Sequence, residues 1–505
     1  MSDADDAAPN GLAAHRWLVP LAATALAVAQ LARVWPWMLD DAFIYLRYAQ
    51  NWVEGHGPNY NVGERCEGYS SFLWIALLAA GHALGGDLVV LARAASIVPA
   101  LIAFVLVQQA WRWIPGLSRN TAAMAAMLLA GHAAFVPWAI SGMETALLAA
   151  LVTALILAWC RFRASPSRAR AWGLGLLAAA TAMTRPEGVI LVLLLALDGT
   201  TRLRRAGWRS PFALWAAVVG AVLLPWTALR LAYYGWLMPN TYYAKVAFTL
   251  EVYERGLVYL AEWLVPAAAL LLCHGLAAWR GALSRAGLAG HGVLLLVWLG
   301  YVVLVGGDFM PAFRFLAPLV PLLCLGAALG IATLRAAAVR RLAFGAVFVA
   351  GLAAGELSPR LVRYLQDDEV AQAGLVIGRF LREHSRPGDV IAVNAAGAIP
   401  FAAQRTAIDM LGLNDEHIAH RPVPGMGRAW AGHEKGDGKY VLARRPQWIL
   451  FGSIGEDRSP RYLSNRELLE LEEFHRRYAL EAHPIDAGTR FPMTTLWVYR
   501  RKDPR

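Results

Sequence analysis

The sequence has few cysteines and few charged residues. Its 505 residues include four cysteines, and only 16% of residues are Asp, Glu, Lys or Arg. Cys160, Cys273 and Cys324 lie in or beside apolar stretches, and Cys66 lies in a polar loop without a second loop cysteine. This pattern indicates neither a disulfide framework nor a zinc site. The scarcity of charge also excludes an ordinary soluble protein.

Hydrophobic residues, by contrast, make up 58% of the chain, and the mean hydropathy is +0.43. These values are typical of a multi-pass membrane protein. The 47 Lys and Arg exceed the 36 Asp and Glu, which gives a net charge of +11. The arginines fall in short clusters between apolar segments, so they indicate membrane topology and not a nucleic-acid partner.

The first apolar segment follows a short acidic stretch, Met1 to Arg16, and ends at Pro36-Trp37-Met38 without a small-residue cleavage site. This pattern predicts an uncleaved first span and not a signal peptide. We expect residues 1–16 to be cytoplasmic.

Eleven apolar segments are long enough to be candidate spans. They are Trp17–Trp37, Leu88–Ala110, Thr121–Trp138, Thr145–Cys160, Ala171–Thr184, Gly188–Leu197, Pro211–Leu231, Leu257–Leu276, Gly292–Val305, Phe315–Thr333 and Leu342–Ala354. Ser70–Leu84 is also apolar but short, so we expect a re-entrant or surface helix there. Ala171–Thr184 and Gly188–Leu197 are short for two spans, and we expect a broken or tilted hairpin.

With eleven crossings, every arginine-rich turn lies inside, as the positive-inside rule requires. The C-terminal part then lies outside. The expected organisation is a transmembrane domain at 17–357, with a first outer loop at 38–87, and an extracytoplasmic α/β domain at 358–505. Within this last part of about 145 residues, Gly388–Asn394, Pro446–Phe451 and Thr494–Tyr499 read as strands and Val370–Glu383 as an amphipathic helix.

Two adjacent carboxylates, Asp40 and Asp41, follow the first span directly. Apolar residues then recur with helical spacing from Ala42 to Val53, which predicts an amphipathic helix lying on the bilayer. Asp40 is placed to cap the start of that helix. Capping needs one carboxylate, and an ionisable group at a membrane is a functional candidate, so the second carboxylate remains to be explained.

The same topology gathers further charged and aromatic residues in the outer loops. Glu144 and Glu187 fit two roles, either as first-turn charges of the helices that follow or as members of a site. Arg185 opposes the dipole of its helix, so we expect it to meet an anion, either Glu187 or a phosphate. Aromatic residues near Lys245 and Arg314 fit an interfacial belt, whereas the two cations could clamp a lipid phosphate.

Several motifs together resemble the GT-C superfamily of polyprenyl-phosphate-sugar glycosyltransferases. They are Asp40-Asp41, Glu67-Gly68-Tyr69, Ser141-Gly142-Met143-Glu144-Thr145, Thr184-Arg185-Pro186-Glu187-Gly188, Pro239-Asn240-Thr241-Tyr242-Tyr243-Ala244-Lys245, Gly307-Asp308-Phe309-Met310-Pro311 with Arg314, and, in the C-terminal part, Asp409 to Asp415 and Gly432-His433-Glu434-Lys435. Within that superfamily, the chain looks most like the group that contains the mycobacterial terminal arabinofuranosyltransferase B.

The resemblance implies an inverting transfer of a sugar, such as the pentofuranose arabinose, from a polyprenyl-phosphate donor to a cell-envelope glycan or glycolipid outside the bacterial plasma membrane. It implies that Asp40 or Asp41 is the general base. The expected substrate-binding residues are Glu67, Tyr69, Glu144, Arg185, Glu187, Asn240, Tyr242, Tyr243, Lys245, Asp308, Arg314, His433 and Lys435. Neither a metal ion nor another cofactor is expected.

One departure from the group concerns the residues after Glu67-Gly68-Tyr69. The group has Thr-Asn there, and this chain has Ser70-Ser71, which keeps a hydroxyl group and loses the amide. The acceptor sugar is therefore left open. Two other functions share the expected features: a non-catalytic GT-C-like protein that binds or assembles glycans, and a transporter of lipid-linked sugars.

Overall fold

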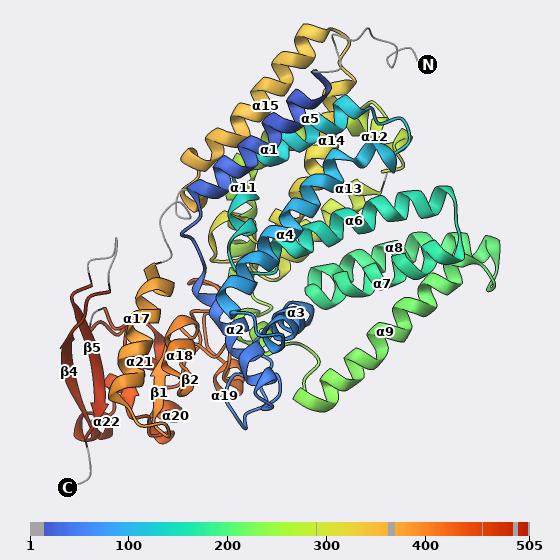
Figure 1. Cartoon of the computed structure of the whole chain (residues 1–505). Coiled ribbons are helices and arrows are strands. Elements are labelled where there is room, and N and C mark those ends of the chain that lie inside the picture. The colour runs from blue at the N-terminus through green and yellow to red at the C-terminus, as the bar shows by residue number, and fades with distance from the viewer. Residues whose placement is uncertain (1–14, 289, 362–368, 457, 488–492, 503–505) are drawn as a thin grey trace.

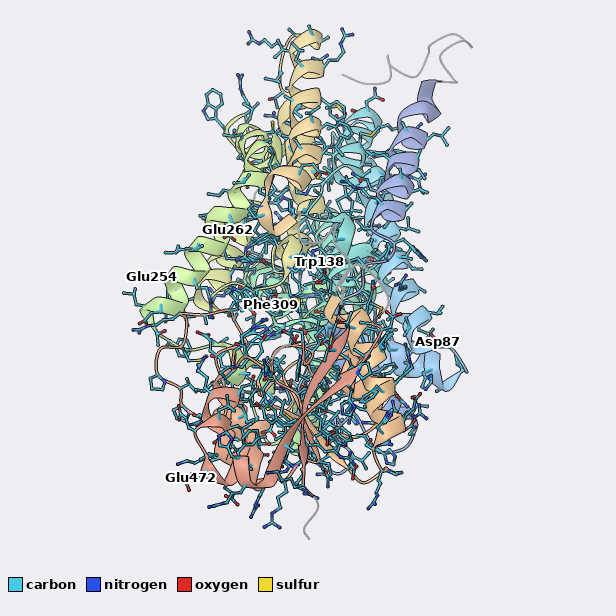
Figure 2. The ribbon with its side chains drawn as sticks, turned by 90° about the vertical axis from the view of Figure 1, so that its left-hand side faces the viewer. Asp87, Trp138, Glu254, Glu262, Phe309 and Glu472 are labelled. Carbon is cyan, nitrogen blue, oxygen red and sulfur yellow. The ribbon has the colours of Figure 1, made fainter. Side chains whose placement is uncertain are left out.

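The computed structural model describes residues 15–288, 290–361, 369–456, 458–487 and 493–502. A helical bundle is joined to a smaller C-terminal α/β region, which comprises the described residues from 369 onward (Figure 1). In Figure 2, the bundle and the C-terminal α/β region lie one above the other, and Phe309 is near the level at which they meet.

Each apolar segment predicted to span the membrane contains a helix. These helices are α1 (His15–Arg33), α4 (Leu88–Gln108), α5 (Arg119–Ala130), α6 (Thr145–Ala164), α7 (Arg168–Thr184), α8 (Pro186–Ala206), α9 (Pro211–Tyr234), α11 (Leu250–Trp279), α13 (His291–Leu304), α14 (Val320–Ala332) and α15 (Ala337–Leu357). Among the described residues, α4, α6, α9, α11 and α15 are long and apolar enough to cross a membrane by themselves. The chain therefore has the character of a multi-pass membrane protein.

The hairpin of α7 and α8 turns at Arg185, where a broken or tilted hairpin was predicted, but both helices are longer than the apolar stretches indicated. The two helices have 17 and 21 residues and are separated by Arg185 alone. Arg185 is extended (φ −161°, ψ 155°), as expected for a residue before proline, and Pro186 occupies the first position of α8. Both helices continue into the arginine-rich segments at their other ends, beyond the apolar stretches from which their lengths were predicted.

The helix α2 (Asp40–Val53) also differs from its prediction. It does not lie on a surface with one polar face, because its residues from Ala42 to Ala49 are all buried. Arg47 lies on the side of α2 opposite the recurring apolar residues and is nevertheless only 7% exposed. The helix is enclosed by the rest of the first loop, including α3 (Phe72–Ala83), and by the C-terminal α/β region. The amphipathic spacing therefore gave a wrong prediction of a surface helix, because polar side chains on α2 contact other parts of the protein and not solvent.

A five-stranded sheet forms the centre of the C-terminal α/β region, with strand order β2-β1-β3-β5-β4. The strands are β1 (Val390–Val393), β2 (Thr406–Asp409), β3 (Trp448–Ile449), β4 (Tyr478–Pro484) and β5 (Thr495–Arg501). β1 pairs in parallel with β2 and β3, whereas β5 pairs antiparallel with β3 and β4. The helices of this region are α17 (Glu369–His384), α18 (Ala398–Ala403), α19 (Glu416–His420), α20 (Gly438–Ala443), α21 (Leu463–Leu469) and α22 (Glu472–Arg477).

The predicted strands correspond to β1, β3 and β5, and the predicted amphipathic helix corresponds to α17. β2 and β4 were not predicted. Residues 1–14, at the N-terminus, and residues 362–368, between the bundle and the C-terminal α/β region in sequence, lie outside the described residues. All four cysteines are free.

Candidate active site

The two carboxylates at the start of α2 have different surroundings. The residue before the helix is Leu39, and no side chain caps the helix, so the predicted capping role of Asp40 is wrong. The Asp40 carboxylate instead accepts hydrogen bonds from the backbone N–H groups of Gly397 (3.1 Å) and Ala398 (2.8 Å). Asp40 therefore holds a segment of the C-terminal α/β region.

Asp41 lines a cavity of about 100 Å³ together with residues from the turn between α7 and α8, from α13 and from the segment that precedes α14. We call it the helix-side cavity. Its charged lining residues are Asp41, Arg185, Lys245 and Arg314. Hydroxyl groups of Tyr45, Ser70, Thr241, Tyr242 and Tyr301 belong to residues of the same lining. The cavity therefore combines positive charge with hydrogen-bonding groups, as an anionic sugar phosphate requires.

A second cavity, of about 220 Å³, lies between the start of α2 and the C-terminal α/β region. We call it the sheet-side cavity. Its aromatic lining residues are Trp37, Phe309, Trp430, His433 and Tyr462, and its polar lining residues include Asp40, Asn394 and Ser453. Four residues, Asp41, Ile44, Lys245 and Leu413, line both cavities. Asp41 is the one carboxylate among them.

The charges around Asp41 act in opposite directions on its pKa. Burial raises the pKa of the Asp41 carboxyl above its usual range, and the positive charges of Lys245 and Arg314 offset part of this effect. Burial, followed by the charge of Arg314, lowers the pKa of Lys245. Perturbed titratable groups that line a cleft are frequent in catalytic sites.

The two arginines of the helix-side cavity are already paired with buried carboxylates. Arg185 Nη1 lies 2.5 Å from Glu144 Oε1, and its Nη2 lies 2.9 Å from Glu187 Oε1. Arg314 Nε lies 2.7 Å from Asp308 Oδ2. Burial alone would raise the pKa of Asp308, but the positive charges, that of Arg314 above all, lower it. Arg185 was expected to meet either Glu187 or a phosphate, and the structure shows its pairing with Glu187.

Lys245 differs from the two arginines. Among the residues that the structure describes, it makes no ion pair, and its Nζ lies 5.8 Å from the centre of the Phe309 ring. It lies at the end of α10 (Asn240–Lys245), a short helix that continues the loop after α9. Its charge, unlike those of Arg185 and Arg314, is therefore not taken up by an ion pair with a described carboxylate.

Several predicted site residues lie outside both cavities and have protein partners. Glu67 pairs with Arg230 of α9 (2.6 Å), and burial raises its pKa to about 7 against the opposing effect of that arginine. The Tyr69 hydroxyl contacts the Tyr234 hydroxyl (3.0 Å). Together these contacts fasten the first loop to the end of α9.

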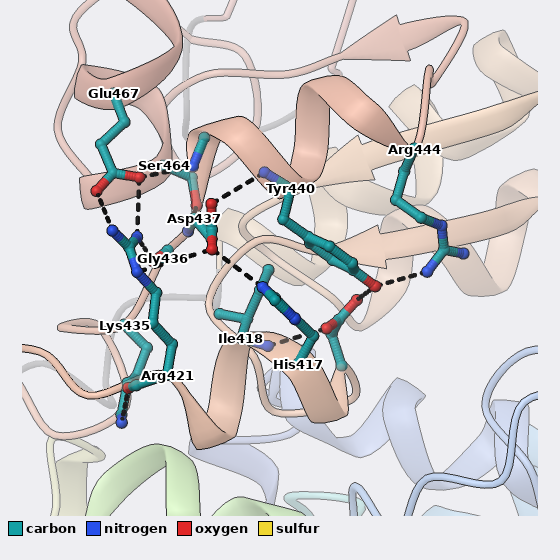
Figure 3. A network of polar contacts seen from close by, with 12 residues as sticks. His417, Ile418, Arg421, Lys435, Gly436, Asp437, Tyr440, Arg444, Ser464 and Glu467 are labelled. Carbon is teal, nitrogen blue, oxygen red and sulfur yellow. Dashed lines mark hydrogen bonds and ion pairs between the residues drawn. The ribbon is translucent and has the colours of Figure 1, made fainter.

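Three further predicted residues also hold the C-terminal α/β region. The Asn240 side-chain amide donates to the carbonyl groups of Gly412 (2.9 Å) and Leu413 (3.0 Å). The ring of Tyr243 lies 4.1 Å from that of His420. Lys435 Nζ donates to the carbonyl of Arg421, within the polar network that Figure 3 shows.

The network of Figure 3 stabilises the C-terminal α/β region away from the two cavities. Asp437 accepts a contact from His417 Nε2 (3.0 Å), and Arg421 pairs with Glu467 (2.9 Å). The Tyr440 hydroxyl donates to Asp415 Oδ2 (3.0 Å). These polar groups pair with one another. Lys435, which was predicted to bind substrate, is therefore part of this polar network and lines neither cavity.

The sheet-side cavity contains four predicted site residues, Asp40, Asp41, Lys245 and His433, whereas its lining residues Asn394 and Ser453 were not predicted. Asn394 directly follows β1, and Ser453 lies a few residues after β3. Both therefore lie beyond the carboxyl ends of parallel strands, where open α/β sheets commonly bind ligands. That rule, applied to the predicted strands, would have found these two residues. The Ser453 and Tyr462 hydroxyl groups contact each other at 3.0 Å.

Comparison with known families gives a match to the C-terminal part. Residues 363–499 match a family described as a domain of unknown function (DUF8728). That match places the boundary of a conserved unit near the start of α17 and leaves its role open.

The chain is also similar in sequence to individual characterised proteins. The chain is 29% identical over 345 residues to a terminal β-(1→2)-arabinofuranosyltransferase from Mycobacterium tuberculosis, covering 58% of this chain and 52% of that protein. It thus spans about half the length of the curated relatives that it matches.

Two solved structures resemble the fold. ArnT from Cupriavidus metallidurans bound to undecaprenyl phosphate has a TM-score of 0.56 at 14% identity, covering 79% of this chain and 86% of ArnT. The mycobacterial arabinofuranosyltransferase AftD has a TM-score of 0.50 at 17% identity, covering 95% of this chain and 40% of AftD. The chain therefore has the GT-C glycosyltransferase fold and is, by sequence, a relative of the terminal arabinofuranosyltransferases.

Proposed function

We propose that this protein transfers a sugar from a polyprenyl-phosphate donor to a hydroxyl group of a cell-envelope glycan or glycolipid. One observation carries the proposal: among the described residues that line both cavities, Asp41 is the only carboxylate. A general base must contact the acceptor hydroxyl group close to the bound donor sugar, so it must lie where the acceptor and donor sites meet. Asp41, and not Asp40, has that position.

The reaction follows from the two cavities. An acceptor hydroxyl group enters from the sheet-side cavity and gives its proton to Asp41. Its oxygen attacks the anomeric carbon of the donor sugar, and the bond from that carbon to the phosphate oxygen breaks on the opposite face. The phosphate leaves with the electron pair, and the configuration at the anomeric carbon is inverted.

The leaving phosphate needs positive charge, which Lys245 and Arg314 supply from the lining of the helix-side cavity. Arg185 contributes less, because it is paired with two buried carboxylates, Glu144 and Glu187, whereas Arg314 is paired with Asp308 alone. The structure of ArnT with undecaprenyl phosphate supports a polyprenyl carrier for a protein of this fold. The arabinofuranosyltransferase relatives favour a pentofuranose such as arabinose as the donor sugar.

The proposed topology follows from the alternation of the turns. Arginine-rich turns follow α4, α6, α8, α11 and α14, and the lining of the helix-side cavity includes residues at or shortly before the starts of α8, α11 and α14. With eleven crossings between 17 and 357, the N-terminus is cytoplasmic. The cavities and residues 358–505 then lie outside the plasma membrane, and the transfer takes place there.

No metal ion has a role in this proposal, because cationic side chains of the protein face the phosphate.

A transfer assay tests the proposed function. The chain in lipid nanodiscs is incubated with a probe donor, a short-chain polyprenyl-phosphoryl arabinofuranose, and a probe acceptor, an alkyl arabinofuranoside. Mass spectrometry then measures the extended glycoside and the released polyprenyl phosphate. A panel of other polyprenyl-phosphoryl pentoses and hexoses tests the donor sugar.

Two alternative functions predict different results in the same assay. A transporter of lipid-linked sugars would move the probe donor across sealed vesicles and form no extended glycoside. A non-catalytic glycan-binding protein would bind the probe acceptor and leave the donor intact. Either result with every donor of the panel would contradict the proposed transfer.

A further inference from the structure

The start of α2 is fastened to one segment of the C-terminal α/β region, residues 396–405, which includes α18. Asp40 accepts hydrogen bonds from the backbone of Gly397 and Ala398. The neighbouring residue in sequence, Asp41, is the proposed base. The segment 396–405 therefore contacts the residue next to the base, although more than 350 positions of sequence separate them.

The same segment also holds the middle of α2. Arg47 is buried and donates to the carbonyl groups of Pro400 (2.6 Å) and Arg405 (2.7 Å). The rings of Phe43 and Phe401 lie 5.5 Å apart. Each buried donor or acceptor in such a set would lose a partner if the segment moved, so the contacts hold α2 at two levels.

Gly397 shows how close the contact is. A Cβ atom at this position would lie 1.9 Å from the backbone oxygen of Asp40 and 2.6 Å from its Oδ2. The backbone oxygen belongs to the peptide group that joins Asp40 to Asp41, so it cannot move away without moving Asp41. The close approach of two backbones, and not a left-handed conformation, requires glycine here, because φ at Gly397 is −94°.

We infer that residues 396–405 are a positioning element, through which the C-terminal α/β region sets the position of Asp41 at the point where the two cavities meet. This inference rests on the proposed function. Gly397 and Asp40 act as positioning residues, since neither touches the reacting atoms. The domain of unknown function then contributes to turnover and not only to the wall of the sheet-side cavity.

The test compares Gly397→Ala with Gly388→Ala in the full chain in nanodiscs. Gly388 belongs to the same region, and a Cβ atom there would meet nothing within 4 Å, so it is a matched control. Hydrogen–deuterium exchange is measured for peptides covering residues 39–48, and kcat and KM are measured with the probe donor and acceptor. Thermal unfolding of each variant is recorded to separate positioning from stability.

For Gly397→Ala we expect faster exchange at residues 39–48 and a kcat lowered about tenfold to hundredfold, since a displacement of about 1 Å has that effect on a catalytic group. The KM for the donor should stay within about twofold, because the cations of the helix-side cavity are untouched. Gly388→Ala should match the unaltered chain in every measurement. A purely structural role for Gly397 would lower the melting temperature and leave the kcat of the folded fraction unchanged.

Two results would overturn the inference: a kcat for Gly397→Ala equal to that of the unaltered chain, or unchanged exchange at residues 39–48. If the unaltered chain forms no product with any donor, the proposed function fails, and the exchange measurement still decides whether the segment holds α2. If Gly397→Ala does not accumulate as folded protein, Asp40→Asn is measured instead. That variant keeps the size of the side chain and removes the charge that the two N–H groups contact, and a kcat equal to that of the unaltered chain would overturn the inference.

Discussion

Asp41 and Lys245 both line the two cavities of this protein, and each shifts the pKa of the other toward its charged form. Asp41 is at the start of α2, and Lys245 is at the end of α10. A carboxylate and an ammonium group thus share the place where a donor and an acceptor would meet. The two side chains therefore have different proposed roles: Asp41 accepts the proton of the acceptor hydroxyl, and Lys245 binds the phosphate of the donor.

Lys245→Met is expected to weaken donor binding. Removing a charge-assisted contact to the phosphate raises the donor KM about tenfold to hundredfold, since such contacts contribute roughly 1.5–3 kcal/mol. Lys439→Met makes the same chemical change at an exposed position of α20 and should leave the donor KM unchanged. Equal donor KM values for both variants would show that Lys245 does not contact the donor.

As the pH is lowered, the transfer rate should begin to fall at a higher pH than the ordinary pKa of an aspartate would predict. A general base acts in its deprotonated form, so activity is lost as the pH falls through its pKa. Because burial raises the pKa of Asp41, the acid limb of kcat/KM should have its midpoint above pH ~4, the usual value for aspartate. A pH profile with the probe substrates measures this, and a midpoint at or below that value contradicts the assignment.

Trp430→Ala is expected to weaken acceptor binding alone. Trp430 is an aromatic residue of the sheet-side cavity, and its side chain is 58% exposed. Loss of one aromatic contact of about 0.5–1.5 kcal/mol raises the acceptor KM by between about twofold and tenfold. Trp208→Ala, at a tryptophan 86% exposed between α8 and α9, is the matched control. A changed donor KM with an unchanged acceptor KM would assign the cavity to the donor instead.

Arg185→Leu is expected to destabilise the bundle more than it affects donor binding. The substitution leaves Glu144 and Glu187 buried and unpaired, and breaking such a pair typically costs about 3–5 kcal/mol. Arg202→Leu removes a partly exposed pair with Asp198 and should cost under about 1 kcal/mol. Thermal unfolding in nanodiscs compares the two, and equal melting temperatures would mean that the buried pairs contribute no stability.

Chelation of divalent metal ions is expected to leave the transfer rate unchanged. In the proposed reaction, the positive charge facing the phosphate comes from Lys245 and Arg314, which line the helix-side cavity and are part of the chain. EDTA followed by gel filtration removes bound ions, and the rate is measured before and after Mg²⁺ or Mn²⁺ is added back. A rate that disappears with EDTA and returns with the ion would assign part of the charge neutralisation to a metal.

Local patterns predicted much of the helical bundle. Apolar runs placed each predicted span on a helix, and Arg185-Pro186 marked the turn between α7 and α8. The lengths of α7 and α8 were underestimated because arginine-rich ends can remain helical beyond an apolar run. These features depend on neighbours in sequence, so the sequence alone contains their signal.

The surroundings of α2 could not be predicted in the same way. Its polar residues suggested a solvated face, but Arg47 contacts carbonyl groups from residues 400 and 405. The contacts of Asp40 likewise come from a distant segment. Short strands such as β2 give little periodic signal, so the sheet that presents Asn394 and Ser453 to the cavity was predicted only in part.

The most direct test of the account is the initial rate of sugar transfer by Asp41→Asn beside Asp40→Asn, with the probe donor and acceptor in nanodiscs. Loss of a general base lowers the rate by about 10²–10⁴-fold. We expect Asp41→Asn to lose activity on that scale and Asp40→Asn to lose less and to keep the acid limb of its pH profile. Transfer by Asp41→Asn at the rate of the unaltered chain, or a larger loss in Asp40→Asn, would contradict Asp41 as the base.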